Sequence, residues 1–467
     1  MKKFIGDKGF YKMIFAVALP IIIQNAITNF VSLLDNIMVG RLGTDAMTGV
    51  SIINQLFFVF NLTIFGAVSA AGIFTAQYYG LKDAKGQTYT FRFKLYMILL
   101  GCLAGVGIFV FFGRPLISSF IHSGSEAVDQ IATMEYAADY MKIMLIGLLP
   151  YSLSQVYAST LRETGETVIP MKASVVSVVT NFVLNYVLIF GAFGLPALGV
   201  KGAAIATVVA RFVELVILFL WTHLHSDNCQ FIVGAYRSPY IPAGLMLQIV
   251  IRGLPLMVNE LLWSMGVTVT NQCYSTRGLD ALAAINIAST ISNLFNIVFL
   301  SMGSVIAIIV GRQLGAGEKE LAIDTDRKLI ALSFTSAVTM GLMLIGVAPF
   351  FPLLYNTTET VQSLATYLII MFAIMMPFHS LAHASYFTIR SGGQVFITIL
   401  FDSVFMWVVA IPVAKLLSGL TSMGIKLLFP ICHGLEAIKA GIGIWLVGKK
   451  TWVRRLVSNT DEKREDR

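Results

Sequence analysis

Long apolar runs constrain this chain more than any other feature of its sequence. They cover residues 97–112, 175–193, 203–221 and 330–351. Such runs approach or exceed the ~20 residues that a helix needs to cross ~30 Å of hydrocarbon. Only 12% of the 467 residues are charged, while 57% are apolar, whereas soluble domains carry about 25% charged residues. The composition therefore requires lipid as the solvent of this protein.

The pattern of apolar and polar segments predicts an all-α polytopic membrane protein with twelve spanning helices. Transmembrane strands are disfavoured because they need short segments of alternating polarity. The scattered cysteines have neither the spacing of a disulfide framework nor that of a zinc site. The expected spans are 13–38, 48–78, 93–113, 134–160, 168–191, 200–222, 247–273, 282–312, 328–351, 361–388, 395–417 and 425–447.

The distribution of the 33 Lys and Arg residues predicts the topology. With the N-terminus in the cytoplasm, most of these residues lie on the cytoplasmic side, as the positive-inside rule requires. Both termini are then cytoplasmic, and the formal charge of +8 reports topology and gives no reason to expect nucleic acid as a partner. The residues expected outside are Arg41, Arg114, Lys201, Arg277, Lys415 and Lys426.

An internal repeat divides the chain into two halves. An offset of 235 positions matches polar residues, prolines and glycines that shared apolar composition does not explain. We expect an N-lobe over residues 1–222, a cytoplasmic linker over 223–246, a C-lobe over 247–448 and a basic cytoplasmic tail over 449–467. Six spans in each lobe give parallel topology and a pseudo-two-fold axis along the membrane normal. The matched pairs include Pro20 with Pro255, Asn36 with Asn271, Gly80 with Gly315 and Arg92 with Arg327.

Asp35 is the leading candidate for a functional residue in the N-lobe. A charged side chain within the bilayer costs at least ~2.5–3.5 kcal/mol, so such residues usually face a cavity. The alternative is that the first span ends early and Asp35 is solvated at the outer mouth. Possible partners are Asn181 and Asn185, whose i, i+4 spacing puts both amides on one helix face, and the hydroxyl of Thr207. One carboxylate with neutral oxygens suits Na⁺, and the same carboxylate could instead take up a proton.

The C-lobe has a different set of polar residues. Glu260 and Asp402 are acidic residues within predicted spans, and we expect them to attract cationic substrates or to form a second coupling site. His383 is a further candidate, against the alternative that it is an ordinary core histidine. Glu214 with Arg211 and Glu436 with Lys439 are spaced i, i+3, which predicts local ion pairs.

Several motifs recur together in one known family. They are Pro20-Ile-Ile-Ile-Gln24, Leu34-Asp35-Asn36, Gly202-Ala-Ala-Ile-Ala-Thr207, Leu254-Pro255, Asn259-Glu260 and Val310-Gly-Arg-Gln-Leu-Gly315. With these motifs the chain resembles the multidrug and toxic compound extrusion (MATE) family, whose members are twelve-helix antiporters that expel organic cations while Na⁺ or H⁺ enters. The resemblance implies that Asp35, Asn181, Asn185 and Thr207 form the ion site of the N-lobe. Some relatives have an acidic residue where this chain has Asn185, so the chain resembles the NorM-like branch. We expect the first span to bend at Pro20.

The expected function is secondary active multidrug efflux by alternating access, in which inward Na⁺ or H⁺ drives the export of cationic or amphipathic drugs. We expect a monomer in the cytoplasmic membrane, with no cofactor besides the coupling ion. The alternative is a flippase for lipid-linked precursors, which would need a cationic cavity. An intramembrane enzyme is disfavoured because the chain has no Asp-x-x-Asp cluster and no His-Glu-x-x-His motif.

Overall fold

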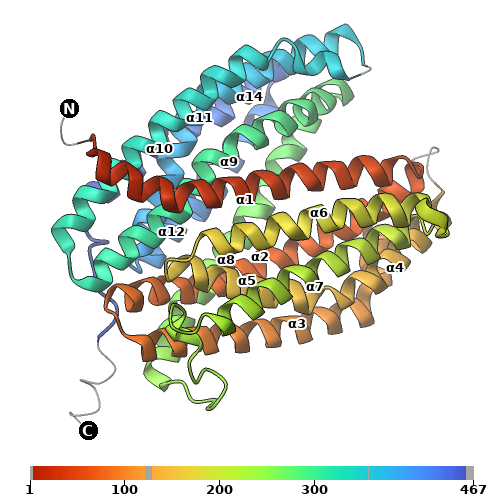
Figure 1. The fold of residues 1–467 in the computed structure, drawn as a ribbon. Helices are drawn as coiled ribbons and strands as arrows, with labels where there is room; N and C mark the ends of the chain where they lie inside the picture. Colours follow the sequence, from red (N-terminus) through yellow and green to blue (C-terminus); the bar gives the residue numbers. More distant parts are fainter. Residues whose placement is uncertain (1–3, 121–128, 356, 459–467) are drawn as a thin grey trace. The chain divides into compact units, whose positions relative to one another are not determined.

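The computed structural model describes residues 4–120, 129–355 and 357–458, and these residues form helices without strands (Figure 1). Residues 459–467 of the predicted basic tail lie outside the described residues. The α-helices are α1 (Lys8–Gly40), α2 (Thr44–Gly80), α3 (Ala84–Phe120), α4 (Gln130–Ile146), α5 (Leu148–Glu163), α6 (Val168–Phe190), α7 (Val200–Leu224), α8 (Ala243–Ser275), α9 (Leu279–Ala316), α10 (Lys319–Val347), α11 (Glu359–Ser391), α12 (Val395–Ile399), α13 (Ile411–Leu420) and α14 (Ile425–Gly448).

The predicted fold class is confirmed. In the described part of the chain, 11 helical stretches are long and apolar enough to cross a membrane. The remaining predicted span, 134–160, which is the fourth along the chain, is formed by α4 and α5, which meet at Gly147. Each of these two helices is too short to span by itself, at 17 and 16 residues.

Several helices are longer than the spans that the apolar runs had predicted. The helix expected over 93–113 is α3, which begins at Ala84 and ends at Phe120. Apolar patterning marks only the part of a helix that lies in hydrocarbon, whereas the backbone hydrogen bonds continue into the polar ends. Two π-helical segments, Leu400–Val404 and Met406–Ala410, lie between α12 and α13. Such segments often mark functional sites.

The described chain separates into two compact units. The N-terminal unit contains residues 23–75 and 84–253, and the C-terminal unit contains 254–467 together with 1–22 and 76–83. The start of α1 and the end of α2 therefore belong with the C-terminal half, whereas the repeat had placed them in the N-lobe. The boundary within α1 follows Ile22, two residues after Pro20.

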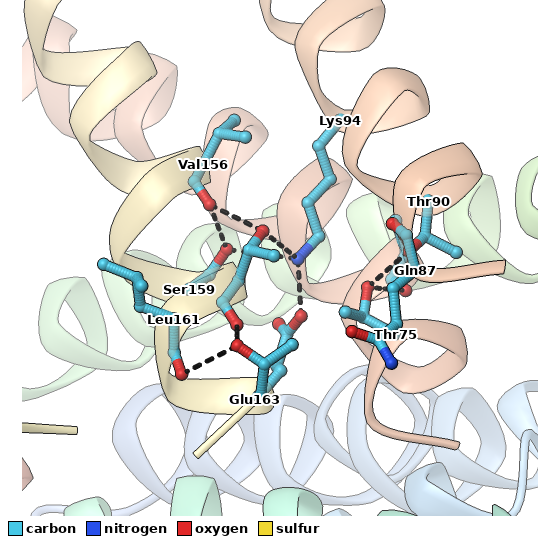
Figure 2. Close-up of polar contacts among 11 residues, drawn as sticks. Thr75, Gln87, Thr90, Lys94, Val156, Ser159, Leu161 and Glu163 are labelled. Atoms are coloured by element: carbon cyan, nitrogen blue, oxygen red, sulfur yellow. Dashed lines mark hydrogen bonds and ion pairs between the residues drawn. The ribbon is translucent and has the colours of Figure 1, made fainter. Parts of the chain in front are cut away.

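The N-terminal unit is organised around α7, which packs against α4, α5 and α6, while α3 packs against α4 and α5. Its interior also contains a buried ion pair, because Lys94 Nζ lies 2.5 Å from Glu163 Oε2. Figure 2 shows this ammonium group among the hydroxyls of α5. Lys94 donates to Ser159 Oγ at 3.3 Å and to Thr160 Oγ1 at 3.1 Å. These bonds offset part of the cost of removing the charge from water.

The C-terminal unit is organised around α11. This helix packs against α9, α10 and α14, and α9 also packs against α10. Apolar side chains from α9 and α11 fill its main core, including Ile291, Phe299, Leu368 and Met376. Within this unit, Asn259 from the middle of α8 and Lys439 from the second half of α14 lie beside Asp402 in the π-helical segment.

Candidate functional site

Asp35 lies beside both amides of α6. Asn185 donates from Nδ2 to Asp35 Oδ1 at 2.5 Å and to Asn181 Oδ1 at 3.1 Å. Asn181 is 6% exposed and Asn185 is 1% exposed, whereas Asp35 is half-buried. The predicted i, i+4 pair thus presents both amides to one carboxylate within the N-terminal unit, and Asp35 is not simply a solvated residue at a helix end.

Thr207 completes the group from α7. Its hydroxyl lies 3.2 Å from Asn181 Nδ2 and donates to the carbonyl of Ala203 at 3.0 Å. The structure therefore brings together all four predicted residues of the N-terminal site, which come from α1, α6 and α7.

The amide of Asn181 also faces the carboxylate of Asp35. With its nitrogen turned toward the carboxylate, it donates to Asp35 Oδ1 at 2.9 Å and to Oδ2 at 3.2 Å, and its oxygen accepts from Thr207 Oγ1 at 3.2 Å. In this orientation Asp35 accepts hydrogen bonds from both amides of α6. Asn185 Oδ1 is buried without a partner among the described residues. One carboxylate with neutral amide and hydroxyl oxygens beside it is a set of groups that fits a proton or a small hard cation.

Glu260 and Asp402 also lie in one cluster, within the C-terminal unit. Asn259 joins them, because its Nδ2 donates to Asp402 Oδ2 at 2.9 Å and to the Tyr386 hydroxyl at 3.3 Å. Tyr386 in turn donates to Glu260 Oε1 at 3.1 Å. Asn259 is fully buried and accepts from Ser403 Oγ at 2.6 Å.

Each acid of this cluster has a basic partner. Glu260 Oε1 lies 3.6 Å from Arg390 Nη1, and Asp402 Oδ1 lies 2.5 Å from Lys439 Nζ. The cluster consequently has no excess negative charge while both pairs are formed. A cation could bind these carboxylates only by competing with Arg390 or Lys439.

The sequence of the chain matches a known family in both halves. Residues 20–187 and 255–416 match the MatE family model. The chain belongs to the MatE family. Curated relatives of this MatE protein include the probable multidrug resistance protein YoeA of Bacillus subtilis, which is 26% identical over 94% of both chains. The probable multidrug resistance protein NorM of Thermotoga maritima is 26% identical over 71% of this chain and 69% of its own.

Solved structures show the same fold. A multidrug resistance MATE family transporter in an outward-facing conformation superposes with a TM-score of 0.82 at 19% identity, covering 96% of this chain and 97% of its own. A mutant of the Vibrio cholerae MATE transporter VcmN gives a TM-score of 0.85 at 18% identity, covering 95% and 97%. The family model confirms the predicted family, and the MatE protein is a multi-pass transporter of a multidrug efflux family and not an enzyme.

His383 lies outside the cluster of Glu260 and Asp402. Its Nε2 lies 3.3 Å from the carbonyl oxygen of Leu300 on α9. The ring packs edge-on against Phe299 and tilted against Phe387. The structure gives this histidine a backbone partner and aromatic neighbours, and its predicted role in substrate binding stays a prediction.

Neither predicted local ion pair forms within 4.0 Å among the described residues. Lys439 Nζ instead lies 2.5 Å from Asp402 Oδ1, and Glu436 Oε1 lies 3.9 Å from His379 Nε2. Glu214 accepts from Ser174 on α6 at 2.7 Å. Arg211 donates to the Gly147 carbonyl at 3.2 Å, where the helix interruption leaves acceptors available. Spacing within one helix indicates which side chains can contact each other, but these residues form their closest polar contacts with residues of other segments.

Sequence reasoning missed a second polar group in the N-terminal unit. Gln24 donates from Nε2 to Ser174 Oγ at 2.8 Å and accepts from Arg162 Nη1 at 3.1 Å. The Ser174 hydroxyl in turn donates a hydrogen bond to Glu214 Oε1. The signal available in the sequence was Gln24 itself, a polar side chain four residues after Pro20 in an apolar span.

Proposed function

We propose that this protein exports cationic or amphipathic drugs in exchange for inward Na⁺ or H⁺, and that Asp35 holds the coupling ion. The observation that carries this proposal is the half-buried carboxylate of Asp35 beside the two buried amides of Asn181 and Asn185, within hydrogen-bond distance of both. A carboxylate removed from water is costly unless a proton or a cation balances its charge. The neutral amide and hydroxyl oxygens beside it supply further ligands for a hard cation.

We further propose that the Asn181 amide responds to the loading of the site. With a proton on Asp35, the acid donates to Asn181 Oδ1 and accepts from Asn185 Nδ2, so the carboxyl group and both amides have partners. With Na⁺, the oxygens of Asp35 and Asn181 act as ligands, as expected for a hard cation. After release, rotation of the Asn181 amide presents its nitrogen to the carboxylate.

The energetics permit such coupling. One charge moving through 100 mV releases about 2.3 kcal/mol, which corresponds to roughly fifty-fold accumulation of substrate. Pro20 is proposed as the bend of α1, since proline lacks the N–H that continues the helical ladder. The boundary between the two units follows this residue closely, which supports a hinge there. We further propose that the protein acts as a monomer in the cytoplasmic membrane with both termini inside.

The C-terminal cluster is proposed as the substrate or second coupling site. A cationic drug would displace Arg390 or Lys439 from the carboxylates of Glu260 or Asp402. His383 remains a candidate that borders this region through Phe387. The lipid-linked-precursor flippase is the weaker alternative, because the charges of this cluster are balanced and do not form a cationic surface.

The proposal is tested by Asp35→Asn in proteoliposomes. We expect this substitution to abolish ethidium export driven by Na⁺ or by a pH gradient, since a neutral amide has no charge to balance the ion. Asn36→Ala serves as the matched control because Asn36 is the adjacent residue with an exposed side chain, and its export should equal that of the wild type. Undiminished export by the Asp35→Asn variant would exclude Asp35 as the coupling residue. Removing Na⁺ at fixed pH distinguishes the two ions.

A further inference from the structure

A groove opens between α10 and α14 of the C-terminal unit. Its volume is about 510 Å³, within the ~300–1,000 Å³ typical of ligand sites. Both helices pack on α11, and Leu381 of α11 forms part of the groove wall. Phe334 and Ile444 contribute exposed apolar side chains from α10 and α14. The walls are therefore suited to an apolar ligand.

Two basic residues line the groove at the polar ends of these helices. Arg327 lies two turns into α10, and Lys450 lies two residues after Gly448, the last residue of α14. Within the part of the chain that the structure describes, neither side chain forms an ion pair with a carboxylate within 4.0 Å. Asp326 also lines the groove, but it is only 1% exposed, and its Oδ1 accepts from the Thr388 hydroxyl at 2.5 Å. The accessible charge of the groove is therefore positive.

The internal repeat allows the surroundings of Arg327 to be compared with those of its repeat partner in the N-terminal unit, where the linker covers the helix surface. Arg92 is the repeat partner of Arg327, and it donates to the carbonyl oxygens of Gly234, Ala235 and Tyr240 at 2.7–2.8 Å. Phe231 of the same linker packs on Phe91 with ring centroids 5.1 Å apart. In the N-terminal unit the linker thus satisfies the guanidinium and covers the apolar surface beside it.

In the C-terminal unit, the described residues that border the groove outside α10, α11 and α14 include Phe4, before α1, and Trp452, after α14. The chain after α14 turns back at Lys450, whose φ is 56°, and buries Trp452 against the helix end, where the indole donates to the Val447 carbonyl at 3.0 Å. Arg327 receives no backbone carbonyl from this segment in the described chain. Residues 459–467 contain only polar and charged side chains, so they do not match the apolar walls.

We propose that this groove binds a phospholipid with an anionic headgroup, whose phosphate contacts Arg327 and Lys450 and whose acyl chain lies along Phe334, Leu381 and Ile444. Basic pockets between transmembrane helices at the cytoplasmic side are suited to such headgroups. The occupant is argued from the combination of an apolar wall with positive charge at one end. This inference does not depend on the coupling ion or on the transported drug.

The test uses the purified full-length protein in a neutral detergent, titrated with phosphatidylglycerol or phosphatidylcholine. Bound lipid is counted by native mass spectrometry, and thermal stability is measured in parallel. We expect phosphatidylglycerol to bind preferentially and to stabilise the wild type. The variant Arg327→Gln/Lys450→Gln should bind it roughly tenfold to thirtyfold more weakly, since each basic residue near an anionic lipid contributes a modest electrostatic attraction.

Two further variants make the result specific. Lys319→Gln/Arg455→Gln removes the same charge from exposed positions of the same unit that do not line the groove, and it should bind lipid as the wild type does. Ala331→Phe fills part of the groove without changing charge and should also weaken binding, which gives a second measure if the double variant folds poorly.

Three outcomes would overturn the proposal. The first is equal binding of phosphatidylglycerol and phosphatidylcholine by the wild type. The second is an equal loss of binding in the control double variant, which would indicate attraction by net charge alone. The third is equal stabilisation by glycerol 3-phosphate, which would indicate a site for soluble phosphate and not for a lipid.

Discussion

Gly80 on α2 and Gly315 on α9 occupy equivalent positions in the two repeats. The ends of these two helices lie directly against each other. A Cβ on Gly80 would meet the carbonyl oxygen of Arg312 on α9, and a Cβ on Gly315 would meet the backbone of Gln77 on α2. The last turns of α2 and α9 therefore pack backbone to backbone within the C-terminal unit. The repeat had matched these glycines without indicating that they meet.

Gly80→Ala and Gly315→Ala should each destabilise the protein by about 1–3 kcal/mol, because a backbone contact cannot yield as a flexible side chain can. Denaturation in sodium dodecyl sulfate, followed by circular dichroism, measures this change. Gly107→Ala is the matched control, since nothing lies within 4 Å of its added Cβ and alanine favours a helix by roughly 0.5–1 kcal/mol. Equal effects of all three substitutions would contradict the close packing of α2 and α9.

Substitutions of Lys94 and Glu163, which form a buried ion pair (Figure 2), should have strongly non-additive effects on the free energy of unfolding. Lys94→Met leaves a buried carboxylate and should cost about 3–5 kcal/mol, whereas replacing both residues with apolar ones should cost less than the two single substitutions together. The same unfolding measurement completes the double-mutant cycle. The exposed pair of Lys201 and Asp139, at 3.2 Å, serves for comparison and should contribute about 0–1 kcal/mol. Additive effects at the buried pair would refute this expectation.

Cys229 reports whether Arg92 holds the linker in place. The thiol is fully buried, and burial together with the charge of Glu166 raises its pKa to about 12. The reactive thiolate is therefore scarce at pH 7–8, and a variant with Cys229 as its sole cysteine should react slowly with maleimide.

Arg92→Gln removes the three hydrogen bonds from Arg92 to the linker and should accelerate this labelling at least tenfold, because the exposed thiol regains an ordinary pKa. Arg237→Gln is the control, since Arg237 is an exposed residue of the same linker, and it should leave the rate unchanged. Two results would show that Arg92 does not protect Cys229. One is fast labelling of the sole-cysteine protein that keeps Arg92, and the other is equally slow labelling of the Arg92→Gln and Arg237→Gln variants.

Lys439 should compete with cationic substrates for Asp402. Lys439→Gln frees the carboxylate and should increase the affinity for a monovalent cationic dye on the order of fivefold or more, within the usual range of coupling between ligands. Equilibrium dye binding to the purified protein measures this change. Lys439→Arg keeps the ion pair and should bind the dye as the wild type does. Unchanged or weaker binding by Lys439→Gln would mean that Asp402 does not contact the substrate.

Much of the architecture could be predicted because the bilayer acts on each segment separately. Apolar length alone identified the spans, and the offset between Pro20 and Pro255 revealed the repeat. The ends of helices were predicted less well, since α3 extends beyond its apolar run at both ends. The interruption at Gly147 had no signal in hydropathy. It lies just before Pro150, in the first turn of α5, and a proline has no N–H to continue the helical hydrogen bonds.

The candidate ion site could be predicted in part, because helix geometry and the cost of a charge in lipid act on each segment separately. Asn181 and Asn185 share a face by helical geometry, and Asp35 is costly to place in lipid without a partner. Their approach to within hydrogen-bond distance depends on how α1, α6 and α7 pack, which involves residues far apart in the sequence. Spacing suggested that Lys439 would pair with Glu436, yet the π-helical segment presents Asp402 at 2.5 Å.

The sequence by itself determined which segments of this protein lie in lipid, that its two halves are copies, and which charged residues need partners. Each of these follows from composition or from the geometry of a single helix. Only the tertiary structure decided which partners those residues have, and that Arg92 is covered by the linker while its copy Arg327 faces an open groove. The reason is that side chains on different helices compete for the same charges and hydrogen bonds, and the outcome depends on distances that no single segment contains.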